Sequence, residues 1–433
     1  MILKQPPFPT LNYNETCYGD PVSYFWRKSK QAIDSEELIQ IPRIFYVLLA
    51  GEATSRLGNN FFDIAIMIYL YKVTSNSVVI GLVSGLFNVL VLLNLITGFL
   101  ADKYLKTRIM QIVDVAQAVL MFVAAVLYFG NDVTVFTIVG ISFLSKIMGT
   151  FFDPAEDALI PQVIAADHLS QANGLNQGLQ MITQIIGMLL GGVLVTLLPI
   201  ASFALINGAT FLVSLVCLTI VNHVLHEQIV VENDETTLGN WYDGIVYVAH
   251  HQVLRIIILL AMIVNLTLGP IMGLDVAWIR GTLHASSFMY SVSQVTLMVG
   301  IILGNVLVNL VKWSLKHKLL FSLTMMATAV LLMALIQNLI VTLLMMAVIG
   351  MAGGFLNVSV FTLIQTRTPG HVLGRVNGAM LAGSNVSLPL GMMLGGLLSG
   401  IVSIAVVYIV GAAITLLATL LIVRVDFAEE TAS

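Results

Sequence analysis

Long apolar runs separated by short polar breaks dominate the chain from position 42 to position 424. Runs of eighteen or more residues recur, and a helix needs about 20 such residues to cross a hydrocarbon core about 30 Å thick. The runs lack the alternation of polar and apolar positions that is typical of membrane β-strands. The pattern therefore predicts an all-α membrane protein.

Taking the polar breaks as loops gives twelve transmembrane helices, and the longest and most polar break divides them six and six. We expect helices over 42–71, 77–101, 107–129, 133–159, 170–196, 200–223, 254–279, 285–311, 319–336, 339–364, 373–399 and 402–423. The predicted parts are a cytoplasmic N-terminal tail (1–41), a six-helix bundle (42–223), a cytoplasmic linker (224–253), a second six-helix bundle (254–424) and a cytoplasmic C-terminal tail (425–433).

The composition excludes most other classes of protein. Of 433 residues, 58% are hydrophobic and only 10% are charged, against about 25% charged in soluble domains. A soluble enzyme, a nucleic-acid binder and a secreted disulfide scaffold are thereby excluded. Cys17 and Cys217 have no metal-site spacing, and no phosphate-binding loop is present. We therefore expect no enzymatic activity, no cofactor and no metal, and transport driven by an ion gradient or by the substrate's own gradient.

The positions of the basic residues orient the predicted helices. If the N-terminus is cytoplasmic, fifteen of the nineteen Lys and Arg residues fall on the cytoplasmic side, and only Lys72 and Arg280 fall outside. Arg56 and Lys146 lie within spans. Cytoplasmic loops carry an excess of Lys and Arg, so the split predicts a multi-pass protein of the cell membrane with both termini in the cytoplasm.

The chain also resembles itself at an offset of 204 residues. Residues 149–194 align without a gap with 353–398, and the matches include the Asn-Gly pairs at 173 and 377 and the Gly-Gly pairs at 191 and 395. The offset equates the fourth and fifth predicted helices with the tenth and eleventh. Such parallel repeats are related by an axis along the membrane normal and are typical of transporters with a midplane site.

The loop after the second predicted helix carries a recognisable motif. The sequence GFLADK at 98–103, followed by Lys106 and Arg108, resembles the Gly-x-Leu-Ala-Asp-Arg-x-x-x-Arg signature of the major facilitator superfamily. The stretches FDPA at 152–155 and GRVNG at 374–378 resemble its macrolide-efflux and enterobactin-exporter branch. The resemblance implies two bundles with pseudo-two-fold symmetry and alternating access. The chain departs from the antiporter signature at 187–192, where GMLLGG lacks its Gly-Pro.

Four polar residues form a stripe along the first predicted helix. Their positions follow the spacing i, i+4, i+7 and i+11, which places them within about 60° of one another over about 16 Å; they are Glu52, Arg56, Asn59 and Asp63. An ionisable group at mid-depth costs about 2.5–3.5 kcal/mol on insertion scales. The stripe therefore predicts a proton-coupling or substrate cavity, and the alternative is a structural ion pair that orients the helix.

Further polar residues within spans extend this predicted cavity. Lys146 needs a partner, for which Glu52 and Asp114 are the candidates. The other members are Gln177, Gln180, Asn265, Asp275 and Asn357. Asp275 lies near the outer end of its span, so exposure to solvent is the alternative reading for it.

A second set of charged residues predicts a cytoplasmic gate. The superfamily resemblance implies that Asp102, with Lys106, Arg108 and Arg375, forms a latch that holds the outward-facing state. Asp153, Glu156 and Asp157 approach the cytoplasmic end of the fourth predicted helix. We expect a gating or structural role for them, the alternative being that they only cap and solvate the helix end.

These features favour a monomeric secondary active transporter that exports amphipathic or cationic drugs or lipophilic metabolites in exchange for protons. Its expected partners are a small-molecule substrate, protons and the lipid bilayer, with no nucleic acid. One alternative is a lipid, lysolipid or specific-solute transporter without proton coupling. Another, from a different class, is a non-transporting receptor or assembly partner, against which the charges retained within the spans argue.

Overall fold

The computed structural model describes residues 42–94, 97–98, 103–130, 134–225 and 241–424, and the elements assigned within them are all helices. The longer α-helices lie where the apolar runs predict them. They are α2 (Arg43–Thr74), α3 (Ser77–Val89), α5 (Lys106–Phe129), α6 (Val135–Val163), α7 (Leu169–Leu194), α8 (Ile200–Val224), α10 (Gln252–Ala277), α11 (Ser287–Leu310), α12 (Leu315–Ile336), α13 (Leu339–Arg367), α14 (Gly370–Ser399) and α15 (Ile404–Arg424).

Short helices extend or connect these elements. The turns η2 (Leu90–Leu93), η3 (Ala166–His168) and η4 (Trp278–Thr282) adjoin α3, α7 and α10. The predicted linker contains α9 (Trp241–His250), which the hydropathy pattern did not predict and which packs on α14. The predicted tails lie outside the described residues.

Within the described residues, ten helices are long and apolar enough to cross a membrane. The remaining predicted spans are α2 and the segment of α3 and η2. α2 has 32 residues, but the charged and amide side chains of its polar stripe lower its hydropathy. α3 and η2 together form a shorter apolar helix, Ser77–Leu93. These ten helices confirm the prediction of an all-α membrane protein. The arrangement of twelve spans stays a prediction.

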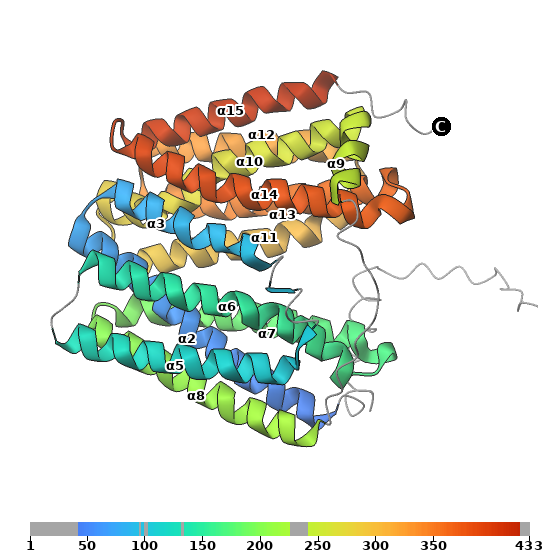
Figure 1. Ribbon diagram of the computed structural model, residues 1–433. Helices are drawn as coiled ribbons and strands as arrows, with labels where there is room; N and C mark the ends of the chain where they lie inside the picture. The colour runs from blue at the N-terminus through green and yellow to red at the C-terminus, as the bar shows by residue number, and fades with distance from the viewer. Residues whose placement is uncertain (1–41, 95–96, 99–102, 131–133, 226–240, 425–433) are drawn as a thin grey trace, which may run out of the picture. The chain divides into compact units, whose positions relative to one another are not determined.

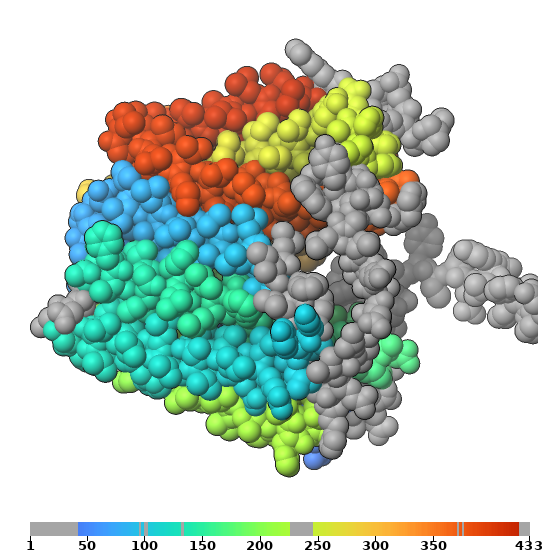
Figure 2. Space-filling model, viewed as in Figure 1, coloured from blue at the N-terminus to red at the C-terminus, as the bar shows by residue number. Residues whose placement is uncertain are grey.

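The helices form two groups that follow the chain (Figure 1). In the first, α5 packs on α6 and α8; in the second, α13 packs on α11 and α12, and α10 packs on α14. α3 lies along α14, and α7 contacts α11, so these contacts join the two groups. Figure 2 shows α3 lying directly against α14 at the molecular surface.

The glycines of the 204-residue repeat pack in equivalent ways. A Cβ at Gly187 or Gly191 would collide with α2, and one at Gly391 or Gly395 would collide with α10. Gly192 faces α11, and its equivalent at position 396 faces α3. Small residues let helices approach closely in membranes. The sequence repeat therefore corresponds to a repeat in helix packing. Each copy places two glycines against the first helix of its own group and one glycine against the other group.

Contacts between the groups gather at one end, which we call the closed end. There Ser399 Oγ donates to Ser77 Oγ at 2.8 Å, and Gly81 lies against Gly396. Farther inside, Ser84 Oγ donates to the Gly273 carbonyl at 3.2 Å. At the opposite end, four glycines have no described atom within 4 Å of a built Cβ: Gly174, Gly178, Gly374 and Gly378. The described parts of the two groups are therefore tied together at the closed end.

Candidate functional site

Five polar side chains from α2, α6 and α7 gather around the guanidinium of Arg56, and we call the six residues together the Arg56 cluster. Its members are Glu52, Arg56, Asp153, Glu156, Asn176 and Gln180. Arg56 Nε donates to Glu52 Oε1 at 2.5 Å, and Arg56 Nη2 donates to Glu156 Oε2 at 3.0 Å and to Asp153 Oδ1 at 3.3 Å. Asn176 donates to Glu156 at 2.7 Å, and Gln180 donates to Glu52 at 3.2 Å.

Helical spacing brings the cluster together. Glu52 and Arg56 are one turn apart on α2, Asp153 and Glu156 one turn apart on α6, and the two amides one turn apart on α7. Side chains three or four residues apart share a helix face. Each of the three helices therefore contributes one pair to a common point.

The cluster holds more buried acidic groups than basic ones. The Glu52 and Glu156 side chains are 3% and 1% exposed, whereas that of Arg56 is 27% exposed and that of Asp153 is 55% exposed. Glu52 Oε2 is buried and has no hydrogen-bond partner among the described residues. Burying a carboxylate is unfavourable unless it is paired. One guanidinium thus serves two buried carboxyl groups, to which the amides of Asn176 and Gln180 also donate hydrogen bonds.

Pro154 lies inside α6, beside this cluster. Proline has no backbone N–H, so the carbonyl four residues earlier loses its helical donor. That carbonyl belongs to Thr150, and it accepts a hydrogen bond from the Thr97 hydroxyl at 2.6 Å. The hydroxyl therefore replaces the lost hydrogen bond and ties α6 to the segment that follows α3.

A separate ion pair lies farther along α2. Lys146 Nζ on α6 donates to Asp63 Oδ2 at 2.7 Å and lies 5.5 Å from the centre of the Phe87 ring. The expectation that Glu52 or Asp114 is the partner of Lys146 is wrong. Sequence gives the face of each helix but not how far one helix is shifted along another, and Glu52 is already engaged by Arg56.

A cavity of about 270 Å³ lies beside the Asp63–Lys146 pair. Asp153 from the Arg56 cluster also lines it, as does Asn59, whose Oδ1 accepts a hydrogen bond from Asn207 at 3.2 Å. Its remaining walls come from α3, η2, α5 and α6, together with Phe62 of α2 and Asn94. The stripe predicted on α2 thus faces protein and a cavity.

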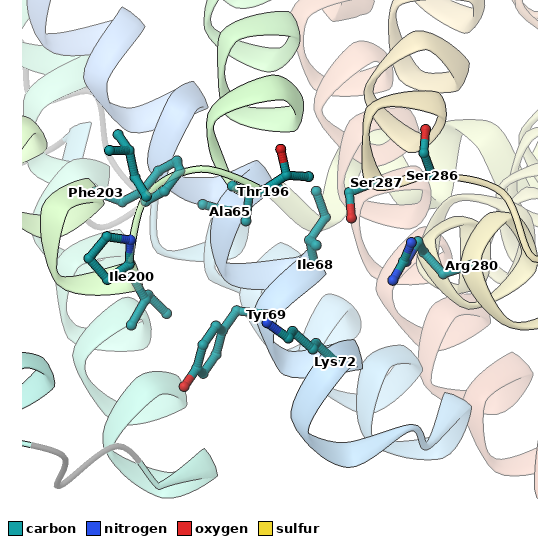
Figure 3. A pocket seen from close by; sticks show the side chains of 13 residues that line it. Ala65, Ile68, Tyr69, Lys72, Thr196, Ile200, Phe203, Arg280, Ser286 and Ser287 are labelled. Atoms are coloured by element: carbon teal, nitrogen blue, oxygen red, sulfur yellow. The ribbon is translucent and has the colours of Figure 1, made fainter.

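A second cavity, of about 370 Å³, lies towards the closed end (Figure 3). It is lined by Lys72 of α2 and Arg280 of η4, together with hydroxyl and apolar side chains from the α7–α8 connection and the start of α11. Figure 3 shows both cations beside this cavity, on elements from the two helix groups. They are the two cations that the sequence places outside the membrane.

The structure does not bring the other predicted cavity residues to the Arg56 cluster. Asp275 is fully buried on α10 and accepts hydrogen bonds from Ser293 at 3.2 Å and Gln294 at 2.9 Å, so solvent exposure is the wrong reading for it. Asn265 donates to its own helix at Ala261. Gln177 on α7 and Asn357 on α13 are exposed.

The predicted latch is only partly within the described residues. Asp102 lies outside them, as does the side chain of Arg375. Lys106 is buried, whereas Arg108 and Asp157 are exposed. The latch therefore stays a prediction, while Asp153 and Glu156 contact Arg56 instead of only capping α6.

Among the residues of these sites that sequence reasoning missed are Asn176, Phe87 and Asn94. Asn176 lies one turn before Gln180 on the face that meets α6, and this spacing could have identified it. Phe87 lies in the second predicted helix among other apolar residues, and no local signal marks it. Asn94 is an amide within the same predicted span, and this polarity could have identified it.

Comparison with known proteins identifies the family. Residues 41–433 match the family described as transmembrane secretion effector, of the major facilitator superfamily. The chain is 21% identical over 358 residues to macrolide efflux protein A of Streptococcus pyogenes, which covers 82% of this chain and 88% of that protein. It is 23% identical over 350 residues to the uncharacterized MFS-type transporter YkuC of Bacillus subtilis, which covers 78% of this chain and 80% of the relative.

Solved structures show the same fold. A variant of the nucleoside transporter NupG matches with a TM-score of 0.67 at 16% identity, covering 88% of this chain and 99% of that one. A bacterial homologue of the iron transporter ferroportin, in an inward-facing state, matches with a TM-score of 0.67 at 16% identity over 88% and 98%. Since the family match spans nearly the whole chain, the protein belongs to the transmembrane secretion effector family of major facilitator transporters.

Proposed function

We propose that the protein is a proton-coupled exporter of amphipathic or cationic molecules, which works by alternating access as a monomer in the cell membrane. The observation that carries this proposal is the Arg56 cluster, in which one guanidinium faces two buried carboxyl groups. The macrolide-efflux relative supports the direction of transport and the substrate class.

The cluster offers a physical route from proton binding to helix movement. With one carboxyl protonated, the remaining carboxylate and Arg56 balance each other, and α2, α6 and α7 stay together. Loss of that proton leaves two buried carboxylates with one cation, which disfavours the same packing. α7 also contacts α11 of the other helix group. A change at the cluster can therefore be transmitted to the contacts between the two helix groups. These contacts are the ones that must rearrange during alternating access.

The orientation from the positive-inside rule makes the closed end extracellular. The described structure would then be open towards the cytoplasm, the side from which an exporter loads its substrate. In the proposed cycle, the Asp102 and Arg375 latch forms when that end closes. The two six-helix bundles, 42–223 and 254–424, act as the moving bodies.

The lining of the 270 Å³ cavity supports the substrate class. Phe62 and Phe87 supply apolar surface, while Asp63 and Asp153 supply two carboxyl groups against the one ammonium of Lys146. Ligand sites combine apolar walls with a few placed polar groups. An amphipathic molecule with a basic amine, such as a macrolide with a tertiary amine, matches both features.

Everted vesicles test the proposal. With an imposed pH gradient, the protein should accumulate such a macrolide, and collapsing the gradient with nigericin should abolish the accumulation. Glu52→Gln should lower gradient-driven accumulation at least tenfold, whereas Lys312→Met, a change at an exposed cation outside the cluster and both cavities, should leave it near wild type. Accumulation that survives nigericin would favour lipid or solute transport without proton coupling. No transport in any condition would favour a receptor or assembly role.

A further inference from the structure

The ammonium of Lys146 occupies a site built for a cation. Asp63 Oδ2 accepts its hydrogen bond at 2.7 Å, and the face of Phe87 lies 5.5 Å from Nζ. A carboxylate and an aromatic ring within about 6 Å are the groups that stabilise a cation in a partly desolvated site. The Lys146 and Asp63 side chains are 30% and 44% exposed. Both groups therefore lie open to the adjoining cavity instead of being sealed in a core.

The same cavity contains polar oxygens without hydrogen-bond partners in the described part of the chain. Asn94 Oδ1 and Ser142 Oγ are buried, line the cavity, and have no hydrogen-bond partner among the described residues. Buried polar atoms in native structures are nearly always hydrogen-bonded. A ligand with several N–H donors would supply the missing hydrogen bonds, because a carbonyl or hydroxyl oxygen accepts them.

The size of the cavity limits what can enter it. Its volume of about 270 Å³ lies just below the range of about 300–1,000 Å³ that is usual for small-molecule sites. Leu90 and Val91 add apolar surface beside Phe87. The cavity therefore suits a small lipophilic amine, or the amine-bearing end of a larger molecule.

We propose that Lys146 is a tethered substitute for the substrate cation. A protonated lipophilic amine displaces the Lys146 ammonium from Asp63 and Phe87 and takes its place in this cavity. Asp153 lies two turns along the same helix and lines the same cavity, so the released ammonium has a second carboxylate towards which it can move. This inference rests on the proposed function only in taking the cavity as the substrate site.

Competition between a tethered and a free cation can be distinguished from a structural role of Lys146. If Lys146 had only a structural role, removal of its charge would weaken amine binding or leave it unchanged. Removing a competitor strengthens the binding of the free cation, since displacement no longer opposes it. Lys146→Met should therefore bind a lipophilic amine about tenfold more tightly than wild type, whereas Lys146→Arg, which keeps a tethered cation, should bind it about as wild type does.

The test is calorimetric titration of the full-length chain in detergent at pH 7, without a proton gradient. The probe is 2-phenylethylamine, and 2-phenylethanol, its neutral analogue, reports non-specific partitioning. Lys146→Met should tighten only the amine, and Asp63→Asn should lose amine binding. Phe87→Leu should weaken amine binding about two- to fivefold, as loss of a partly exposed cation–π contact does. Lys312→Met, at an exposed cation on the connection between α11 and α12 and outside both cavities, is the matched control.

Three results would overturn the inference. They are amine binding by Lys146→Met that is no tighter than wild type, equal tightening for the alcohol, and unchanged amine binding by Asp63→Asn. If neither wild type nor Lys146→Met binds the amine, this outcome is a case of the first result and also overturns the inference. If Lys146→Met does not elute as a folded monomer, Lys146→Gln tests the same loss of charge. Because no gradient is present, failure of proton coupling in vesicles would not alter these results, and failure here would leave proton-coupled export standing.

Discussion

Replacing Arg56 with methionine removes the cation from the Arg56 cluster while keeping most of the apolar volume of the side chain. Glu52 and Glu156, 3% and 1% exposed, are then left facing each other. Breaking a buried ion pair costs about 3–5 kcal/mol. Since Arg56 itself is 27% exposed and solvent screens part of the interaction, we expect Arg56→Met to lower the free energy of unfolding by about 2–4 kcal/mol.

Neutralising one acid should reverse part of that loss. Glu156→Gln in the Arg56→Met background removes an uncompensated charge, and we expect it to restore about 1–2 kcal/mol. Residues in one hydrogen-bonded network couple by about 0.5–3 kcal/mol. SDS-titration unfolding in mixed micelles measures both variants, with Lys72→Met as an exposed-cation control that should change by less than about 0.5 kcal/mol. If Arg56→Met matches this control, or Glu156→Gln gives no restoration, the electrostatic account of the cluster is refuted.

Two further variants test the packing. Gly192→Leu places a side chain against Ser291 of α11, so spin labels across the closed end should move apart, whereas Gly178→Leu, at a position without described neighbours, should leave their distance unchanged. Trp278→Ala should destabilise the protein by about 3–5 kcal/mol, since this side chain is fully buried against Tyr408 and donates to Thr342 at 3.2 Å; a loss below 1 kcal/mol in SDS titration would contradict the packing.

The apolar runs predicted the positions of the long helices because each run must satisfy its backbone hydrogen bonds internally in lipid. The charged stripe on α2 was predictable for a related reason: four polar residues at helical spacing cannot all face hydrocarbon. The repeat was visible because its glycines make equivalent close contacts, as Gly187 and Gly391 do with α2 and α10. These features depend on spacing along one helix or on identity between two segments.

What sequence could not give is how far each helix is shifted along its neighbours. Lys146 was expected to meet Glu52 or Asp114 but meets Asp63, which lies three turns beyond Glu52 on α2. Similarly, the glycine spacing on α7 does not say which helix each glycine meets: Gly187 and Gly191 pack on α2, and Gly192 contacts α11. Solvent exposure of Asp275 could not be excluded from sequence, because its hydrogen-bond partners Ser293 and Gln294 lie on another helix.

Proton movement during transport tests the central claim most directly. Proteoliposomes contain a trapped pH-sensitive dye, and no proton gradient is imposed. A macrolide substrate is added on the side that faces the end of the transporter opposite the closed end. Wild type should move protons in the direction opposite to the substrate, and Glu52→Gln combined with Glu156→Gln should move none although the protein remains folded. Substrate transport without any proton movement in wild type, or unchanged proton movement in the double variant, would contradict proton-coupled export through the Arg56 cluster.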